Sequence, residues 1–216
     1  MKIFVRFFFA LLLTSCVLFC FSYFVWYSPE SKPANRDTYK SNFKKSSEEF
    51  NKLKSKAESL KEFAHAHSYN KELFFLVDMS ITSGKYRFFV YDGEKDSVVL
   101  KGLAAHGSCD SGFQQDPTFS NTKESGCSSL GKYKIGTSYK GKFGLAYKLY
   151  GLDSSNSNAF ERNIVLHAYD CVPEKEADPQ PICNSRGCPM VSPGILKQLK
   201  PIIDNSTRPI LLWIFE

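Results

Sequence analysis

Apolar residues follow three successive patterns along this chain. The first is a run over residues 7–27 that contains no charged side chain and comes directly after Lys2 and Arg6. A helix of that length spans about 30 Å, close to the thickness of the hydrocarbon core of a bilayer. Residues 1–27 are therefore predicted to form a membrane anchor, with the two cations holding the N-terminus on the cytoplasmic side.

Two other interpretations of residues 1–27 stay open. One is a cleaved signal peptide, although no A-x-A cleavage site follows and the apolar run is long for such a peptide. The other is lipidation at Cys16, because Leu13-Thr14-Ser15-Cys16 is similar to a lipoprotein box. All three interpretations predict that the remainder of the chain lies outside the cytoplasm.

The second pattern has the period of an amphipathic helix. After a polar linker over residues 28–36, residues 37–68 carry a stripe of side chains at steps of three and four. Its members are Tyr39, Phe43, Ser46, Phe50, Leu53, Ala57, Leu60 and Ala64. Several of them are too small for the seam of a self-associating stalk, so we expect the helix to pack on its own domain. His65 and His67 lie on different faces and are expected at the surface.

The third pattern begins at Glu72, where short runs of aromatic and β-branched residues replace the helical period. These runs predict a meander of strands with turns at Ser83-Gly84 and Asp92-Gly93. The expected strands cover residues 73–80, 85–92 and 97–107, short stretches within 139–152, and a terminal strand over 210–215. The result is a mostly β domain over residues 69–216.

Two further segments complete this prediction. Residues 109–131 have no clear period and predict a long loop, which in a compact domain usually has a function. Ser192 and Pro193 look like the cap and the first residue of a helix, and Pro201 is expected to end or kink that helix.

Candidate chemistry lies between residues 163 and 190. An apolar run ends in His167, and Cys188 follows in a Gly-Cys-Pro turn with Arg186 beside it. The attacking species of a cysteine is its thiolate, which a nearby imidazole, an arginine or a helix N-terminus favours. His167, Arg186 and the helix that begins at Pro193 could supply all three. The alternative is that the cysteine and the histidine are ordinary core residues.

The segments NIVLHAY and SRGCPMVS resemble the catalytic segment of the murein L,D-transpeptidases, the YkuD-like cysteine transpeptidases of bacterial cell walls. The pattern of that family is a histidine, a variable gap and then Ser/Thr-X-Gly-Cys. It falls here on His167, Ser185, Gly187 and Cys188. Many members carry a second histidine before the Gly-Cys pair, where this chain has Arg186. That departure is similar to the branch called the murein L,D-transpeptidase catalytic domain family.

The resemblance implies a mixed β-sandwich that transfers acyl groups on the stem peptides of peptidoglycan and needs no cofactor. Cys188 would attack the carbonyl of the third, diamino-acid residue of a tetrapeptide donor and expel the terminal D-alanine. His167 would accept the thiol proton and later activate the acceptor amine. Backbone N–H groups near Gly187 and Cys188 would hold the oxyanion, and Gly187 would allow close approach of the substrate.

Five more residues are candidates for substrate binding. Ser185 would shape the turn or bind the donor, and Arg186 would hold a substrate carboxylate or remain a solvated charge. His106 ends the third strand in an Ala-His-Gly sequence similar to that of the family, and it would line the donor site or be structural. Ser120 and Asn121 lie in a Phe-Ser-Asn sequence that resembles a signature of this branch.

Five of the seven cysteines lie beyond the apolar run. In an oxidising compartment an odd number fits two disulfides and one free thiol. Cys109 and Cys127 bracket the long loop, and Cys171 and Cys183 bracket the insert before the Gly-Cys-Pro turn, but the sequence leaves the connectivity open. The alternative is a metal site formed by the last three cysteines and His167. Its gaps differ from the tight pairs of zinc sites, so no metal is expected.

Composition narrows the choice of partners. The 216 residues are 43% hydrophobic with a net charge of +6. The cations are mixed with acidic residues and follow a segment that predicts export, so nucleic acid is not an expected partner. The same segment predicts that the domain lies in the periplasm, anchored to the inner membrane. Two rival functions remain: an L,D-carboxypeptidase or endopeptidase that uses the same site on water, and a non-enzymatic wall-binding protein. A papain-like protease is disfavoured because its cysteine precedes its histidine.

Overall fold

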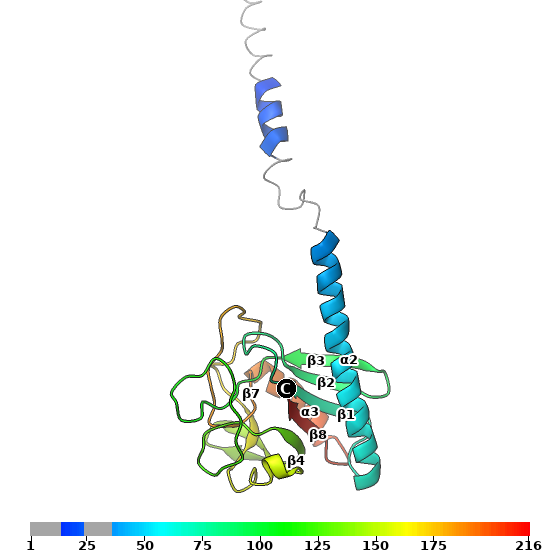
Figure 1. Cartoon of the computed structure of the whole chain (residues 1–216), viewed down its shortest axis with the longest axis vertical. Helices are drawn as coiled ribbons and strands as arrows, with labels where there is room; N and C mark the ends of the chain where they lie inside the picture. Colours follow the sequence, from blue (N-terminus) through cyan, green and yellow to red (C-terminus); the bar gives the residue numbers. More distant parts are fainter. Residues whose placement is uncertain (1–13, 24–35) are drawn as a thin grey trace, which may run out of the picture. The chain divides into compact units, whose positions relative to one another are not determined.

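The computed structural model describes residues 14–23 and 36–216 (Figure 1). Residues 14–23 are helical. The following elements are α2 (Arg36–His67), β1 (Leu73–Asp78), β2 (Phe88–Asp92), β3 (Ser97–Gly102), β4 (Gly131–Gly141), β5 (Gly144–Gly151), the 3-10 helix η2 (Ser154–Asn156), β6 (Val165–Ala168), β7 (Met190–Val191), α3 (Pro193–Asp204) and β8 (Leu211–Phe215). The chain divides into two compact units, Met1–Glu49 and Phe50–Glu216, and the second contains the sheet.

The strands form one mixed sheet in the order β3-β2-β1-β8-β4-β5-β6-β7. The pairs β1–β8 and β6–β7 are parallel, and the other neighbours are antiparallel. The fold is mostly β, as predicted, but it differs from the expected sandwich of two sheets. Both edges of the C-terminal strand β8 are hydrogen-bonded, one to β1 and one to β4, and this joins the two halves into one continuous sheet.

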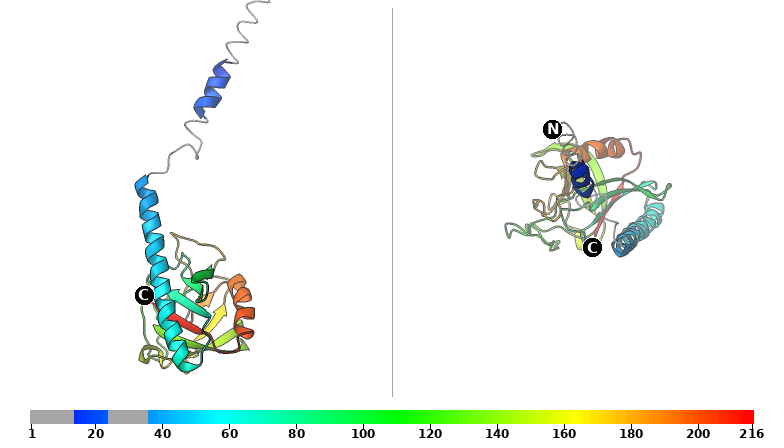
Figure 2. Two further views of the ribbon diagram at one scale, coloured as in Figure 1. Left: turned by 90° about the vertical axis from the view of Figure 1, so that its right-hand side faces the viewer. Right: turned by 90° about the horizontal axis from the view of Figure 1, so that it is seen from above.

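The two faces of β1 are covered by different helices, because successive side chains of a strand point to opposite faces. Phe74 and Leu76 pack against α2, whereas Phe75 and Val77 pack into a core that includes α3. Figure 2 shows α3 and the part of α2 from Phe50 onwards on opposite sides of the sheet. The buried stripe of α2 consists of Leu53, Ala57, Leu60 and Ala64. From Phe50 onwards the helix therefore packs on its own domain, as predicted. His65 and His67 are exposed.

Helix α3 begins as its sequence predicts. Ser192 is the cap, its side chain accepts a hydrogen bond from the N–H of Ile195, and Pro193 is the first helical residue. Pro201 does not end the helix, which continues to Asp204. A proline lacks only its own N–H, and its carbonyl still accepts a hydrogen bond from the N–H of Asn205.

Two disulfides fasten the irregular segments. They join Cys109 to Cys127 and Cys171 to Cys183, and Cys188 is free. The prediction of two disulfides and a free thiol beyond the apolar run is confirmed. The alternative metal site is excluded, because two of its four ligands are bonded to each other.

The predicted anchor lies largely outside the described residues, which include only 14–23 of its apolar run. Within the described ranges, no helix combines the length and the apolar character that a membrane crossing requires.

Candidate active site

The candidate nucleophile lies in the turn that precedes β7, next to the strand that carries His167. β6 and β7 pair in parallel, with His167 opposite Met190, two residues after Cys188. The Cys188 side chain packs on the main core, and its sulfur lies 3.9 Å from the carbonyl oxygen of Asn163. Residues distant in sequence are therefore brought together by one short parallel ladder.

Cys188 borders two cavities. We call the first, of about 400 Å³, the apolar cavity. It is lined by Ser108, Gly112, Phe143, His167, Tyr169, Cys171, Asn184, Ser185, Arg186, Cys188 and Met190. We call the second, of about 410 Å³, the charged cavity, and it is lined by Lys123, Glu124, Gly126, Glu161, Arg162, Asn163, Arg186 and Cys188.

The turn around Cys188 is fixed by serine hydroxyls. Ser185 Oγ accepts a hydrogen bond from the N–H of Gly187 (3.1 Å) and donates one to the carbonyl of Cys188 (2.7 Å). Ser128 Oγ donates to the carbonyl of Gly187 (3.2 Å). Gly187 has φ +107°, and a Cβ there would lie 2.6 Å from the carbonyl oxygen of Cys127. Position 187 therefore requires glycine. Ser185 shapes the turn, which is one of the two roles expected of it.

This bonding changes the expected oxyanion site. The N–H of Gly187 already donates to Ser185 and is not free for a substrate. In the described part of the chain the N–H of Cys188 donates to no acceptor. Of the two expected donors, only Cys188 is left available.

His167 is almost fully buried, and its ring is held on two sides. Nδ1 lies 3.1 Å from the carbonyl oxygen of Ala168, so we assign the hydrogen to Nδ1 and leave Nε2 as the basic nitrogen. The ring stacks on Phe143, with 5.2 Å between centroids. Burial lowers the pKa of His167 below its ordinary value. The imidazole is therefore neutral at neutral pH and able to accept a proton.

The thiol is also neutral at rest. Burial raises the pKa of Cys188, against the opposing effects of a hydrogen bond from Val165 and the positive charges of Arg162 and Lys148. A base must therefore remove its proton, and His167 lines the same cavity.

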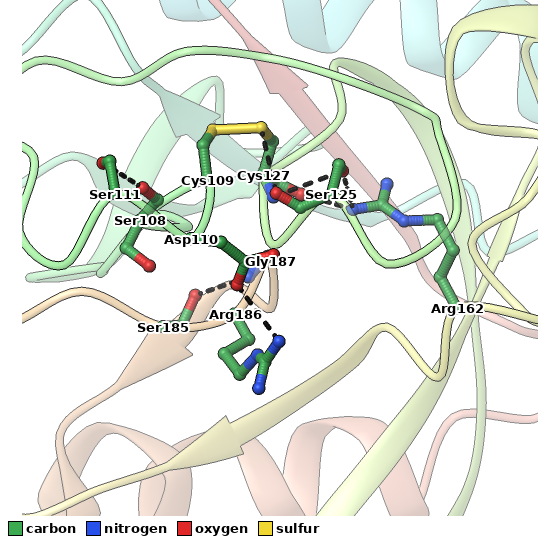
Figure 3. Close-up of polar contacts among 10 residues, drawn as sticks. All are labelled: Ser108, Cys109, Asp110, Ser111, Ser125, Cys127, Arg162, Ser185, Arg186 and Gly187. Carbon is green, nitrogen blue, oxygen red and sulfur yellow. Dashed lines mark hydrogen bonds and ion pairs between the residues drawn. A yellow bond between two sulfur atoms is a disulfide. The ribbon is translucent and has the colours of Figure 1, made fainter.

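Two of the three expected influences on the thiol are engaged elsewhere. Arg186 is 79% exposed and forms an ion pair with Asp110 at 3.0 Å (Figure 3). The N-terminus of α3 is occupied by Glu174, whose carboxylate accepts hydrogen bonds from Ser192 Oγ and the N–H of Gly194. Arg162, to which no sequence motif pointed, lines the charged cavity with Cys188 and makes no ion pair within the described ranges. Lys148 also acts on the thiol without an ion pair there, but it lines neither cavity, and its ammonium donates a hydrogen bond to Asn163 Oδ1.

Three expected substrate-binding residues line neither cavity. His106 is fully buried, and its Nδ1 accepts a hydrogen bond from Arg87 (2.8 Å). The carbonyl of Ser120 accepts a hydrogen bond from Arg162, and the side chain of Asn121 ties the loop to residues 154–158. Their contacts are those of a scaffold.

Phe143, Tyr169 and Asn184 line the apolar cavity, although no sequence motif pointed to them. The signal for Phe143 was an aromatic residue at the tip of a Lys/Gly-rich hairpin, where no core exists to bury it. Arg162 gave no signal, because a single arginine before a strand is ordinary.

Residues 44–213 match the L,D-transpeptidase catalytic domain family. No curated protein matches the chain. Similar solved structures include the Ldtfm–avibactam carbamoyl enzyme (14% identity, TM-score 0.40, covering 68% of this chain and 50% of that one). Another is an L,D-transpeptidase from Xylanimonas cellulosilytica (14% identity, TM-score 0.37, covering 71% of this chain and 68% of that one). A third is the helical cell shape determining protein Pgp2 from Campylobacter jejuni (14% identity, TM-score 0.41, covering 67% of this chain and 48% of that one).

The chain spans about half the length of the first and third of these proteins. The family match, by contrast, extends from α2 into β8 and takes in the sheet, both cavities and the Gly-Cys-Pro turn. On that match, this chain belongs to the L,D-transpeptidase catalytic domain family.

Proposed function

We propose that this protein is a peptidoglycan L,D-transpeptidase that works through a thioester on Cys188. His167 Nε2 accepts the thiol proton as the sulfur attacks the carbonyl of the third residue of a tetrapeptide stem. The C–S bond forms, the C–N bond to the terminal D-alanine breaks, and the imidazolium returns its proton to the leaving amine. An acceptor amine then attacks the thioester carbonyl, loses a proton to His167 and releases the thiol.

The observation that carries this proposal is that Cys188 borders two cavities of similar volume. A transferase must bring a donor and an acceptor to one sulfur, whereas a hydrolase needs room only for the donor and water. The N–H of Cys188 is the expected donor to the oxyanion, and Ser185 and Gly187 hold that N–H in place.

The experiment that tests it compares products with and without an acceptor. The full chain is incubated with a tetrapeptide-stem muropeptide alone, and then with a second muropeptide that carries a free amine. We expect cross-linked product that depends on the acceptor. Release of D-alanine at the same rate without any cross-link would instead indicate the carboxypeptidase. Absence of both products would favour the wall-binding protein.

We also propose that the catalytic domain works in the periplasm, anchored by residues 1–27. Two lines support this location: the uncharged run over residues 7–27, and two disulfides, which persist in oxidising compartments. The full chain should remain in carbonate-washed membranes at its unprocessed mass. A soluble form that begins near Ser28 would show cleavage, and an added lipid mass on a chain beginning at Cys16 would show lipidation.

A further inference from the structure

Arg162 places a positive charge against the turn that carries the candidate nucleophile. Its half-buried side chain lines the charged cavity together with Cys188. A Cβ on Gly187, the residue before Cys188, would lie 3.3 Å from Arg162 Nη2. The guanidinium thus packs on the backbone of the Gly-Cys pair from the side of the charged cavity, whereas His167 lines the apolar cavity.

The guanidinium is oriented by neutral groups. Nη1 donates to the carbonyl of Ser120 (2.8 Å) and to Ser129 Oγ (2.9 Å), and Nη2 donates to Ser125 Oγ (3.3 Å) and to the carbonyl of Cys127. Among the described residues no carboxylate forms an ion pair with it. Neutral acceptors fix the direction of a cation without cancelling its charge, so the positive charge stays available to the site.

Arg186 shows the opposite arrangement. Arg186 lies within the sequence motif, directly before the Gly-Cys pair, yet its guanidinium is exposed to solvent and paired with Asp110 (Figure 3). Water and a carboxylate both weaken the field of this cation at the sulfur.

The loop whose carbonyls and hydroxyls accept the hydrogen bonds of Arg162 is itself fastened to the Gly-Cys turn. The disulfide Cys109–Cys127 closes this loop, and Figure 3 shows the arginine directed at Ser125 and Cys127 beside the disulfide. Ser128 Oγ accepts a hydrogen bond from the N–H of Gly107 (3.0 Å) and donates one to the carbonyl of Gly187. The charge, the disulfide-closed loop and the Gly-Cys turn are therefore linked by one continuous set of hydrogen bonds.

We propose that Arg162 is a positioning residue whose fixed charge stabilises the Cys188 thiolate as it forms. This inference rests on the proposed function for its view of Cys188 as the nucleophile. A cation held close to a half-buried thiol favours the charged form over the neutral one. In the resting state burial outweighs this attraction, and the balance shifts when His167 takes the proton.

The test measures thiolate formation directly and needs no peptidoglycan. The full-length chain is alkylated with iodoacetamide over a series of pH values, and the labelled Cys188 peptide is quantified by mass spectrometry, which separates it from the free Cys16 and Cys20. The variants are Arg162→Gln and Arg162→Lys, with Arg208→Gln as the matched control. Arg208 is an exposed arginine that lines neither cavity at Cys188.

We expect Arg162→Gln to slow alkylation at neutral pH by about tenfold and to move the midpoint of the profile to higher pH. Arg162→Lys should keep most of the rate, because it keeps the charge, and Arg208→Gln should match the wild type. Superimposable profiles for the wild type and Arg162→Gln would overturn the proposal. If Arg162→Gln does not fold, the lysine variant decides: a preserved midpoint supports the role of the charge, and a midpoint shifted to higher pH overturns it.

The outcome is separable from that of the proposed function. A shifted alkylation profile without any cross-linked product would retain Arg162 as the cation of the thiol and reject the transpeptidase. Cross-linked product with an unshifted alkylation profile would retain the transpeptidase and reject the role of Arg162.

Discussion

The ring of Phe143 lies nearly parallel to the imidazole of His167, with 5.2 Å between the centroids and 19° between the planes. Phe143 comes from the tight turn between β4 and β5 and is itself half-exposed, and Tyr169 meets its edge at 5.5 Å. This hairpin tip shields one face of the imidazole from water. The shielding contributes to the burial that keeps His167 neutral.

Replacing Phe143 by alanine should therefore leave less of His167 in its neutral, proton-accepting form in mild acid. With its face exposed to water, the imidazole is less desolvated and its pKa moves up toward the ordinary value. A larger fraction is then protonated in mild acid, so the acid limb of the pH–rate profile should move to higher pH. We expect a loss of roughly two- to fourfold in rate near pH 6, because an imidazole with the ordinary pKa of about 6.5 is only about one quarter neutral at that pH.

The matched control for this variant is Phe160→Ala. Phe160 is also half-exposed and stacks on Tyr150 at 5.0 Å, but it lines neither cavity. Its pH–rate profile should match that of the wild type. A profile of Phe143→Ala that coincides with the wild type would contradict the shielding role.

Ser185→Ala should loosen the turn that presents Cys188. The variant loses the hydrogen bonds to the N–H of Gly187 and the carbonyl of Cys188 and leaves both groups unpaired. We expect the free energy of unfolding to fall by about 1–3 kcal/mol and the rate of thioester formation to fall by about tenfold. Chemical denaturation and single-turnover kinetics measure the two effects.

Ser111→Ala is the comparison for that experiment. Among the described residues its hydroxyl bonds only to the nearby carbonyl of Ser108, at 2.6 Å on the surface, so we expect a change in the free energy of unfolding within about 0.5 kcal/mol. Equal stability and equal rates for the two serine variants would show that Ser185 does not hold the turn.

The features that could be predicted from the sequence are local ones. The stripe that ends at Ala64 predicted a helix packed on its own domain, and Ser192 with Pro193 predicted the start of α3, because such signals depend on neighbours within one or two turns. His167 and Cys188 were identified by a motif, and the structure brings them to one cavity.

The remainder depends on contacts between distant segments, which no local pattern encodes. The pairing of β8 with both β1 and β4 turned an expected sandwich into one sheet. The fold distinguishes the two arginines near the thiol. It pairs Arg186 with Asp110, whereas Arg162 donates hydrogen bonds to neutral carbonyls and hydroxyls. The burial of His106 against Arg87, away from both cavities, likewise depends on contacts between distant segments.

His106 makes the stability of the protein depend on pH. Burial and the charge of Arg87 lower the pKa of His106 to about 4, with Gln114 and Asp116 opposing. Between about pH 6.5 and 4 the unfolded chain binds a proton at this residue and the folded chain does not. The stabilisation is therefore complete above about pH 6.5 and is lost as the pH falls through about 4, a change on the order of 3 kcal/mol.

The variant His106→Gln checks this dependence. Glutamine can still accept the hydrogen bond from Arg87 but does not titrate. The unfolding free energy of the wild type should fall more steeply than that of the variant between pH 6.5 and 4, whatever their difference at pH 7. Parallel stability curves would contradict the assignment of a low pKa to His106.

The most direct test of the central claim is the intact mass of the protein during reaction with a tetrapeptide-stem donor. The wild type should gain the mass of the donor less its terminal D-alanine. A free thiol added afterwards should remove this adduct, as expected of a thioester. His167→Ala should acquire it about 10²- to 10⁴-fold more slowly, because the proton acceptor is gone. Cys188→Ser should show no adduct and no product, since an alcohol is far less acidic than a thiol. Product formed by Cys188→Ser, or product formed by the wild type without a covalent adduct on Cys188 in a rapid quench, would contradict catalysis through this thiol.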